Sequence, residues 1–190
     1  GATSSALMAR FLRHFGLIPN IRIPDRIFEG YGPNPNVIRE LIDNGAQLIV
    51  TVDCGSSSFE SFDLAKSLGA DVVVFDHHQI GTDLPDAIAL VNPNRQDDLS
   101  GQGHLCAAGV VFLGLVAINR QLRNRGFYTA NRTAPDLMSW LDLVALGTVC
   151  DVVPLKGLNR AFVLRGLDII RQQRNPGIAA LSRVSRQDGP

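Results

Sequence analysis

The chain has 190 residues, of which 45% are hydrophobic and 19% charged, so it can bury the core of an α/β domain and is not a disordered tail. Aromatic residues make up only 6%, which argues against an all-β sandwich and against a surface that stacks bases on several rings. Lys plus Arg and Asp plus Glu number 18 each, which excludes a polybasic or acidic-tail protein.

The charges are unevenly distributed although they cancel. Acidic side chains outnumber basic ones in residues 1–118, and basic ones dominate residues 119–190. An acidic part suits cations and a basic part suits a polyanion, but two ordinary solvated surfaces would give the same pattern. Charge alone therefore leaves the kind of partner open.

The cysteines and the apolar runs indicate a cytoplasmic protein. Cys54, Cys106 and Cys150 form no CxxC pair, which disfavours structural zinc and a disulfide framework and fits a reducing compartment. The longest uncharged apolar run, Leu105–Ile118, is shorter than the roughly 20 residues that span a bilayer. Because no signal-peptide pattern opens the chain, we expect no association with a membrane.

The first part of the chain alternates between predicted helices and short apolar strands. Helices are predicted over residues 2–15, 36–44 and 59–68. Strands are predicted over 47–52 and 71–75, with weaker candidates at 21–23 and 87–91. Continuous β-branched runs are typical of strands covered on both faces of a parallel sheet. Residues 1–95 are therefore predicted to form a parallel sheet flanked by helices, which is an α/β fold.

The second part is predicted to be mainly helical. A linker rich in Gly, Asp and Gln, Gln96–Gly103, separates it from the α/β part. Helices are predicted over residues 104–123, 137–146 and 159–171, and no convincing strand follows the linker. We expect residues 96–190 to be the helical remainder of the same domain.

The start of the chain leads to a further expectation. A doubly wound fold places a strand before a helix such as the one predicted at residues 2–15, yet nothing precedes Gly1, and Gly1 is not a Met. We expect the chain to be a fragment that has lost its first strand.

Acidic residues and histidines follow two of the predicted strands. Asp53 comes after the first strong strand, and Asp76-His77-His78 comes after the second. A further acid, Asp151, interrupts an apolar stretch and needs a cationic or hydrogen-bonding partner there. Ligands of parallel sheets bind beyond the carboxyl ends of the strands, so these side chains are candidates for one site.

The residue types in this set favour a divalent cation. Carboxylates with imidazoles and without thiolates suit Mn²⁺ or Mg²⁺, and two such ions can promote phosphoryl displacement. Backbone N–H groups of Gly55 and Ser56 could hold an anion there. Asp53 alone could be a helix N-cap, and adjacent histidines are often a polar loop, but their joint occurrence with Asp151 favours the metal site.

Asp76-His77-His78 resembles the signature of the DHH phosphoesterase superfamily. Further segments, in the same order along nearly the whole chain, resemble the RecJ family of single-strand-specific DNA exonucleases within it. These segments are Pro24–Arg26, Glu29–Gly32, Thr51–Gly55, Val91–Pro93, Leu105–Val110, Ala145–Leu155 and Asn159–Arg160.

The resemblance implies a role for each matching residue. Asp53 would bridge two metal ions, and His77 and Asp151 would be metal ligands. His78 would contact the scissile phosphate and act as an acid, while Asp76 would orient a histidine. The family's Asp-x-Asp motif would precede Gly1, so this chain is expected to be impaired on its own.

The resemblance also implies a substrate. The parent protein would degrade single-stranded DNA from the 5′ end in repair and recombination, with a single-strand-binding protein or a helicase as a candidate partner. Arg26 and Arg160 could meet DNA phosphates, although each could also be an ordinary surface or structural arginine. His104 could touch substrate, although a polar residue at a helix start accounts for it better. The alternatives are a DHH enzyme for nanoRNA, nucleotide bisphosphate or pyrophosphate, and a non-catalytic DNA-binding scaffold.

Overall fold

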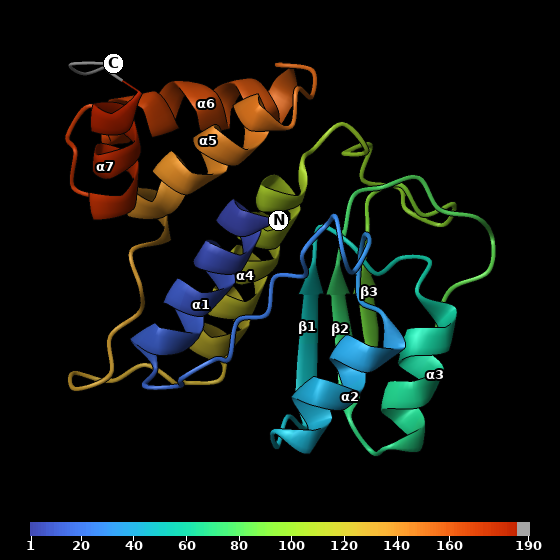
Figure 1. Ribbon diagram of the computed structural model, residues 1–190. Helices are drawn as coiled ribbons and strands as arrows, with labels where there is room; N and C mark the ends of the chain where they lie inside the picture. Colours follow the sequence, from blue (N-terminus) through green and yellow to red (C-terminus); the bar gives the residue numbers. More distant parts are fainter. Residues whose placement is uncertain (186–190) are drawn as a thin grey trace.

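A parallel sheet forms the centre of the first part of the chain. The computed structural model describes residues 1–185, and its sheet has the order β1-β2-β3, with β1 at Leu48–Val52, β2 at Asp71–Phe75 and β3 at Ala89–Val91. Val52 pairs with Phe75 and Phe75 pairs with Val91, so all three strands end at one edge (Figure 1).

Successive residues of the strands enter two different cores, because side chains alternate between the faces of a sheet. On one face, Ile49, Val72 and Val74 pack with Ile38 of α2 (Pro35–Asp43) and Phe62 of α3 (Phe59–Ser67). This burial on both faces accounts for the continuous apolar runs of the strands.

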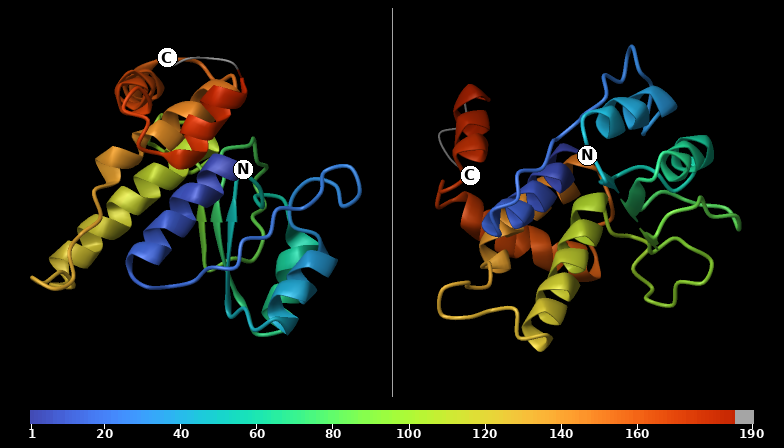
Figure 2. Two further views of the ribbon diagram at one scale, coloured as in Figure 1. Left: turned by 60° about the vertical axis from the view of Figure 1, so that its left-hand side comes forward. Right: turned by 90° about the horizontal axis from the view of Figure 1, so that it is seen from below.

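The opposite face of the sheet packs against one helix from the start of the chain and one from its helical half. Phe75 lies in a core with Leu7 of α1 (Ala2–His14) and Val111 of α4 (Ala107–Asn124). Both views of Figure 2 show α1 running beside α4, which joins the start of the chain to its helical half.

The helical half continues with a single 3-10 turn and three helices. They are η1 (Leu137–Trp140), α5 (Leu141–Cys150), α6 (Gly157–Ile170) and α7 (Pro176–Val184). The axes of α5 and α6 approach closely at Gly166, where an added Cβ would overlap Ala145 and the carbonyl of Leu141. The predicted fold class, a helix-flanked parallel sheet followed by a mainly helical part, is confirmed.

Two details of the predicted elements were wrong. Residues 21–23 form no strand: they lie between Pro19 and Pro24, which lack an N–H to donate, and the Arg22 side chain is held by Glu29 and Glu40. Helix α7 was not predicted, although its Asn175-Pro176 start is a recognisable N-cap signal. Within residues 1–185, no helix is both long and apolar enough to span a membrane.

The close approach of α5 and α6 makes Gly166 a sensitive position. Gly166→Ala should lower the free energy of unfolding by about 1–3 kcal/mol, because the methyl group would overlap the facing helix. At Gly109 in α4 the added Cβ would lie 3.4 Å from Leu105, so Gly109→Ala should leave stability unchanged or raise it by up to about 1 kcal/mol. Urea unfolding followed by circular dichroism measures both, and equal stability of the two variants would contradict the close packing of α5 and α6.

Candidate active site

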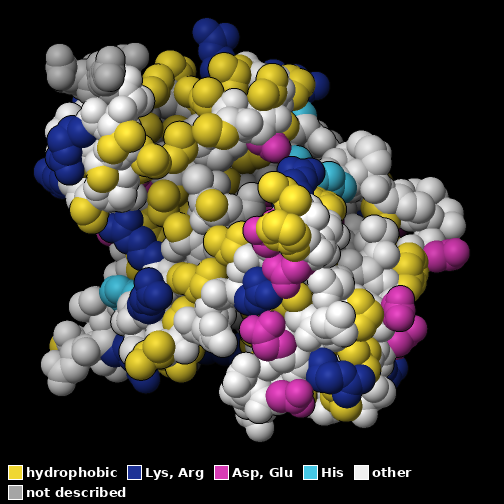
Figure 3. All heavy atoms as spheres, viewed as in Figure 1, with side chains coloured by type: hydrophobic (Ala, Val, Ile, Leu, Met, Phe, Trp, Pro, Cys, Tyr) yellow, Lys and Arg dark blue, Asp and Glu magenta, His cyan; other side chains and the backbone are white. Residues whose placement is uncertain are grey.

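The three strand ends bring polar residues together at one edge of the sheet. Asp53 follows β1, Asp76-His77-His78 follows β2, and Asn92 follows β3. Asp53 has a φ of 64°, a left-handed conformation that Asp tolerates better than most residues and that turns the chain at the strand end. In the space-filling view, acidic and histidine side chains reach the surface where the helical half meets the α/β part (Figure 3).

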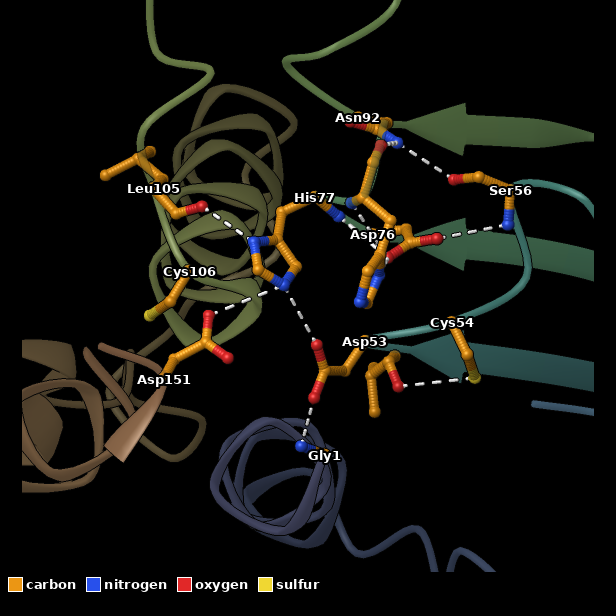
Figure 4. A network of polar contacts seen from close by, with 12 residues as sticks. Gly1, Asp53, Cys54, Ser56, Asp76, His77, Asn92, Leu105, Cys106 and Asp151 are labelled. Atoms are coloured by element: carbon orange, nitrogen blue, oxygen red, sulfur yellow. Dashed lines mark hydrogen bonds and ion pairs between the residues drawn. The ribbon is translucent and has the colours of Figure 1, made fainter. Parts of the chain in front are cut away.

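His77 lies at the centre of the cluster, and its two ring nitrogens have different surroundings. Nδ1 is 3.0 Å from the carbonyl oxygen of Leu105, which only accepts, so Nδ1 carries the proton and donates. Nε2 is buried without an aligned hydrogen bond, 3.2 Å from Oδ1 of Asp53 and 3.5 Å from Oδ2 of Asp151 (Figure 4).

This arrangement fits a divalent cation. When the imidazole is neutral with its proton on Nδ1, the lone pair of Nε2 points toward two carboxylate oxygens. The lone pair and the carboxylates repel each other unless a positive charge lies between them. Metal-bound histidines are held in the same way, with the second nitrogen donating to a carbonyl or carboxylate. Asp53, His77 and Asp151 therefore form a donor set that suits Mn²⁺ or Mg²⁺.

The pKa shifts of Asp53 and His77 agree with a cation at this position. Burial opposes the charge on Asp53, but contacts with the opposite effect, the one with His77 first among them, outweigh burial and lower the pKa of Asp53. Burial likewise opposes a positive charge on His77, but the carboxylates of Asp53 and Asp151 outweigh it and raise the pKa of His77. Both effects favour positive charge between these side chains.

Asp76 orients the second histidine. Its buried carboxylate accepts from Nδ1 of His78 at 2.7 Å and from the backbone N–H of His77 at 2.8 Å, while Oδ2 accepts from the N–H of Ser56 at 3.1 Å. Burial alone would raise the pKa of Asp76, but these hydrogen bonds outweigh it and lower the pKa. His78 stays 46% exposed, with its ring held at the surface of the cluster.

The loop after Pro24 reaches the same cluster. The hydroxyl of Tyr31 donates to the backbone carbonyl of Asp53 and lies 3.1 Å from Nε2 of His78. The guanidinium of Arg26 lies 5.2 Å from the centre of the Tyr31 ring. Burial and the charge of Asp53 raise the pKa of Tyr31, so its phenol stays neutral.

The remaining predicted site residues are placed as follows. Gly55 has a φ of 111°, which requires glycine at this turn. The sequence predicts that the backbone N–H of Ser56 holds an anion. In the structure this N–H donates to Asp76, so it is not free to bind one. Arg160 is exposed on α6, and the neighbouring Asn159 donates to the carbonyl of His104 at 2.7 Å. Roles for His104 and Arg160 stay predictions.

The thiol of Cys54 lies beside the cluster but is a poor candidate for a nucleophile. Burial, followed by the charges of Asp76 and Asp53, raises the pKa of Cys54 to about 12. A protonated thiol is a weak nucleophile, so the chemistry of the cluster is that of its carboxylates and imidazoles.

Sequence reasoning gave no role to three residues that shape the site. Tyr31 contacts Asp53 and His78, Asn92 donates to the carbonyl of His78 at 2.9 Å, and Asn94 donates to the carbonyl of His77 at 2.6 Å. Tyr31 and Asn92 lie in segments that resemble the family, and Asn94 follows at once. Their position beside motif residues was the available signal.

A cavity of about 380 Å³ borders the cluster. Its lining includes Asp53 and Asp151 together with residues from the first turns of α1 and α4, among them Thr3 and Ala107. Backbone N–H groups at helix starts have no partner within the helix and favour anions.

The parallel sheet with Asp and Asp-His-His at neighbouring strand ends defines a class of protein, the DHH-type phosphoesterase fold. Comparison with known protein families matches residues 1–148 to the DHH family, N-terminal domain, and the chain belongs to this family.

Individual relatives agree with this assignment. The chain is 45% identical over 192 residues to the single-stranded-DNA-specific exonuclease RecJ of Salmonella typhimurium, covering 99% of this chain and 33% of that protein. It is 35% identical to RecJ of Bacillus subtilis, over 99% of this chain and 22% of that protein. The chain thus spans a third or less of the length of these curated relatives.

Two solved structures are also similar. A crystal structure of exonuclease RecJ bound to manganese aligns with a TM-score of 0.84 and 32% identity, covering 100% of this chain and 46% of that chain. RecJ from Thermus thermophilus in complex with Mn²⁺ aligns with a TM-score of 0.76 and 29% identity, covering 97% of this chain and 25% of that chain.

The hydrogen bonds of Asp76 yield a stability prediction. Both carboxylate oxygens of Asp76 accept hydrogen bonds, but Asp76→Asn leaves only one oxygen to accept them. At least one buried donor then loses its partner, so the free energy of unfolding should fall by about 1–3 kcal/mol. Asp83 is exposed, and Asp83→Asn should change stability by less than about 0.5 kcal/mol. Urea unfolding in chelator measures both, and an unaltered Asp76→Asn variant would refute the orienting role.

Proposed function

We propose that this chain carries the metal-binding and catalytic core of a RecJ-type exonuclease, a hydrolase that cleaves the phosphodiester bonds of single-stranded DNA from the 5′ end in repair and recombination. The observation that carries the proposal is Nε2 of His77, buried between the carboxylates of Asp53 and Asp151 without a hydrogen-bond partner. The similarity to single-stranded-DNA exonucleases over nearly the whole chain supports the choice of substrate.

Asp53, His77 and Asp151 would hold Mn²⁺ or Mg²⁺, and the solved relatives bound to manganese support Mn²⁺. The family resemblance also suggests that two such ions would be held, with Asp53 as a ligand of both. A bound cation of this kind polarises a phosphate oxygen and lowers the pKa of water.

His78 is proposed to act at the scissile phosphate. Asp76 accepts from Nδ1 of His78, and the hydroxyl of Tyr31, whose hydrogen goes to the carbonyl of Asp53, can accept from Nε2. Both ring nitrogens thus face acceptors, and a ring that donates from both is an imidazolium, the form that can give a proton from Nε2 to the leaving oxygen. Asp76 fixes the ring while this proton is transferred.

Substrate contacts are proposed for residues around this cluster. Arg26, stacked on Tyr31 and exposed, would meet a DNA phosphate beside His78. Gly55, Ser56, His104 and Arg160 are proposed as further contacts, Ser56 through its side chain. A cytoplasmic location, supported by three free cysteines, and a single-strand-binding protein or helicase as partner belong to the same proposal.

Metal binding tests the ligand assignment. Calorimetric titration of Mn²⁺ should show affinity at least about 10-fold lower for Asp53→Asn and His77→Ala than for the unsubstituted chain, because each removes a ligand. Asp83→Asn removes an exposed carboxylate outside the cluster and should bind as before. Unchanged affinity in either ligand variant would rule out the assigned roles.

Hydrolysis tests the substrate. The 190-residue chain, alone and joined to the sequence that flanks it in its genome, should be assayed with Mn²⁺ on single-stranded DNA, duplex DNA, a dinucleotide RNA and pyrophosphate. We expect the joined chain to degrade single-stranded DNA at least about 100-fold faster than duplex DNA, and the 190-residue chain alone to be slower. In the joined chain His78→Ala should slow the degradation by about 100-fold or more, as expected for loss of a general acid. Brisk cleavage of pyrophosphate or dinucleotide without digestion of DNA would favour another DHH activity, and metal binding without hydrolysis would favour a scaffold.

A further inference from the structure

Asn94 joins the two halves of the chain at the candidate metal site. Its Nδ2 donates to the carbonyl of His77 at 2.6 Å and to the carbonyl of Gly103 at 3.1 Å. Its backbone N–H donates to Oδ1 of Asn92 at 2.8 Å, which fixes where the side chain starts. Because both partners of the amide are carbonyls, the NH₂ group must face them. One side chain therefore holds a histidine of the α/β part against the linker to the helical half.

The linker segment held by Asn94 carries the carbonyl that sets the protonation of His77. The N–H of Leu105 donates to the carbonyl of Gln102 at 2.9 Å, so residues 102–105 form one turn that contains Gly103. Nδ1 of His77 donates to the carbonyl of Leu105 at 3.0 Å. Asn94 thus acts on His77 in two ways. It donates directly to the backbone of His77, and it holds the turn whose Leu105 carbonyl accepts from the His77 ring.

Gly103 allows this contact because it has no side chain. An added Cβ would overlap Oδ1 of Asn94, while Gly103 does not have the left-handed φ that would otherwise require glycine. The glycine is therefore needed for the close approach of Asn94 and not for the turn itself. Gly81, on the loop that follows the Asp-His-His triplet, has open space around its Cβ position and no positive φ, so it provides a matched control.

We propose that Asn94 is a positioning residue that fixes His77 as the Nδ1–H tautomer, leaving Nε2 free to bind a cation, by holding the turn at residues 102–105 against the histidine. The effect of Asn94 on Nε2 of His77 is indirect, because Asn94 contacts the backbone of His77 and not its ring. The proposal extends the proposed function but concerns the metal-free chain as well, because the tautomer exists before any cation binds.

The first test is the tautomer itself. In the ¹⁵N-labelled, metal-free chain at a pH where His77 is neutral, the ring nitrogen shifts should show Nδ1 protonated in the unsubstituted protein and in Gly81→Ala. Asn94→Ala and Gly103→Ala should both show a mixture of tautomers, because the carbonyl of Leu105 is no longer held in place. A tautomer that is unchanged in both variants would overturn the proposal, whether or not the protein cleaves DNA.

The second test is the coupling of the two variants in Mn²⁺ affinity. Asn94→Ala and Gly103→Ala should each weaken binding by about 10-fold, the effect typical of outer-shell partners of a metal ligand. The double variant should be no weaker than the weaker single one, because both changes break the same contact. Thermal unfolding verifies that each variant is folded, and Gly103→Ala decides the outcome if Asn94→Ala is not. The positioning role would be contradicted if the loss of Mn²⁺ affinity in the double variant were the product of the two single losses. It would also be contradicted if the single variants bound Mn²⁺ as tightly as Gly81→Ala.

Discussion

The candidate site depends on the negative charge that two carboxylates bring close to Nε2 of His77. Two carboxylates lie within 3.5 Å of one buried nitrogen, and negative charge gathered around the lone pair of that nitrogen is unfavourable unless a positive charge compensates it. A proton can compensate in the metal-free protein, and a divalent cation compensates more fully. The fold keeps these groups together because each is attached to a different rigid element.

Those elements come from both halves of the chain, so the site exists only where the halves meet. Asp53 and His77 lie at the ends of β1 and β2, whereas Asp151 follows the last turn of α5. Val152, directly after Asp151, has a φ of 57°, a conformation that β-branched residues avoid and that costs about 1–3 kcal/mol. The two helices that flank this turn, α5 and α6, pack against each other.

The cluster contains two groups of side chains. Asp53, His77 and Asp151 form a donor set that suits a divalent cation, while Asp76, His78 and Tyr31 form a hydrogen-bonded group beside it. Arg26 lies over the ring of Tyr31 and so adds a positive charge beside the second group.

The sequence by itself determined the parallel sheet, the residues that follow its strands and the family to which the chain belongs, because β-branched runs, helix caps and motif residues act over a few positions. It did not exclude a strand at residues 21–23, since pairing depends on a neighbour that the local pattern does not contain. Only the tertiary structure decided that the ring of His77 meets the carbonyl of Leu105, or that Asn94 reaches Gly103. Such contacts join segments from the two halves, and their positions follow from how the sheet and the helices pack, which no short stretch of sequence encodes.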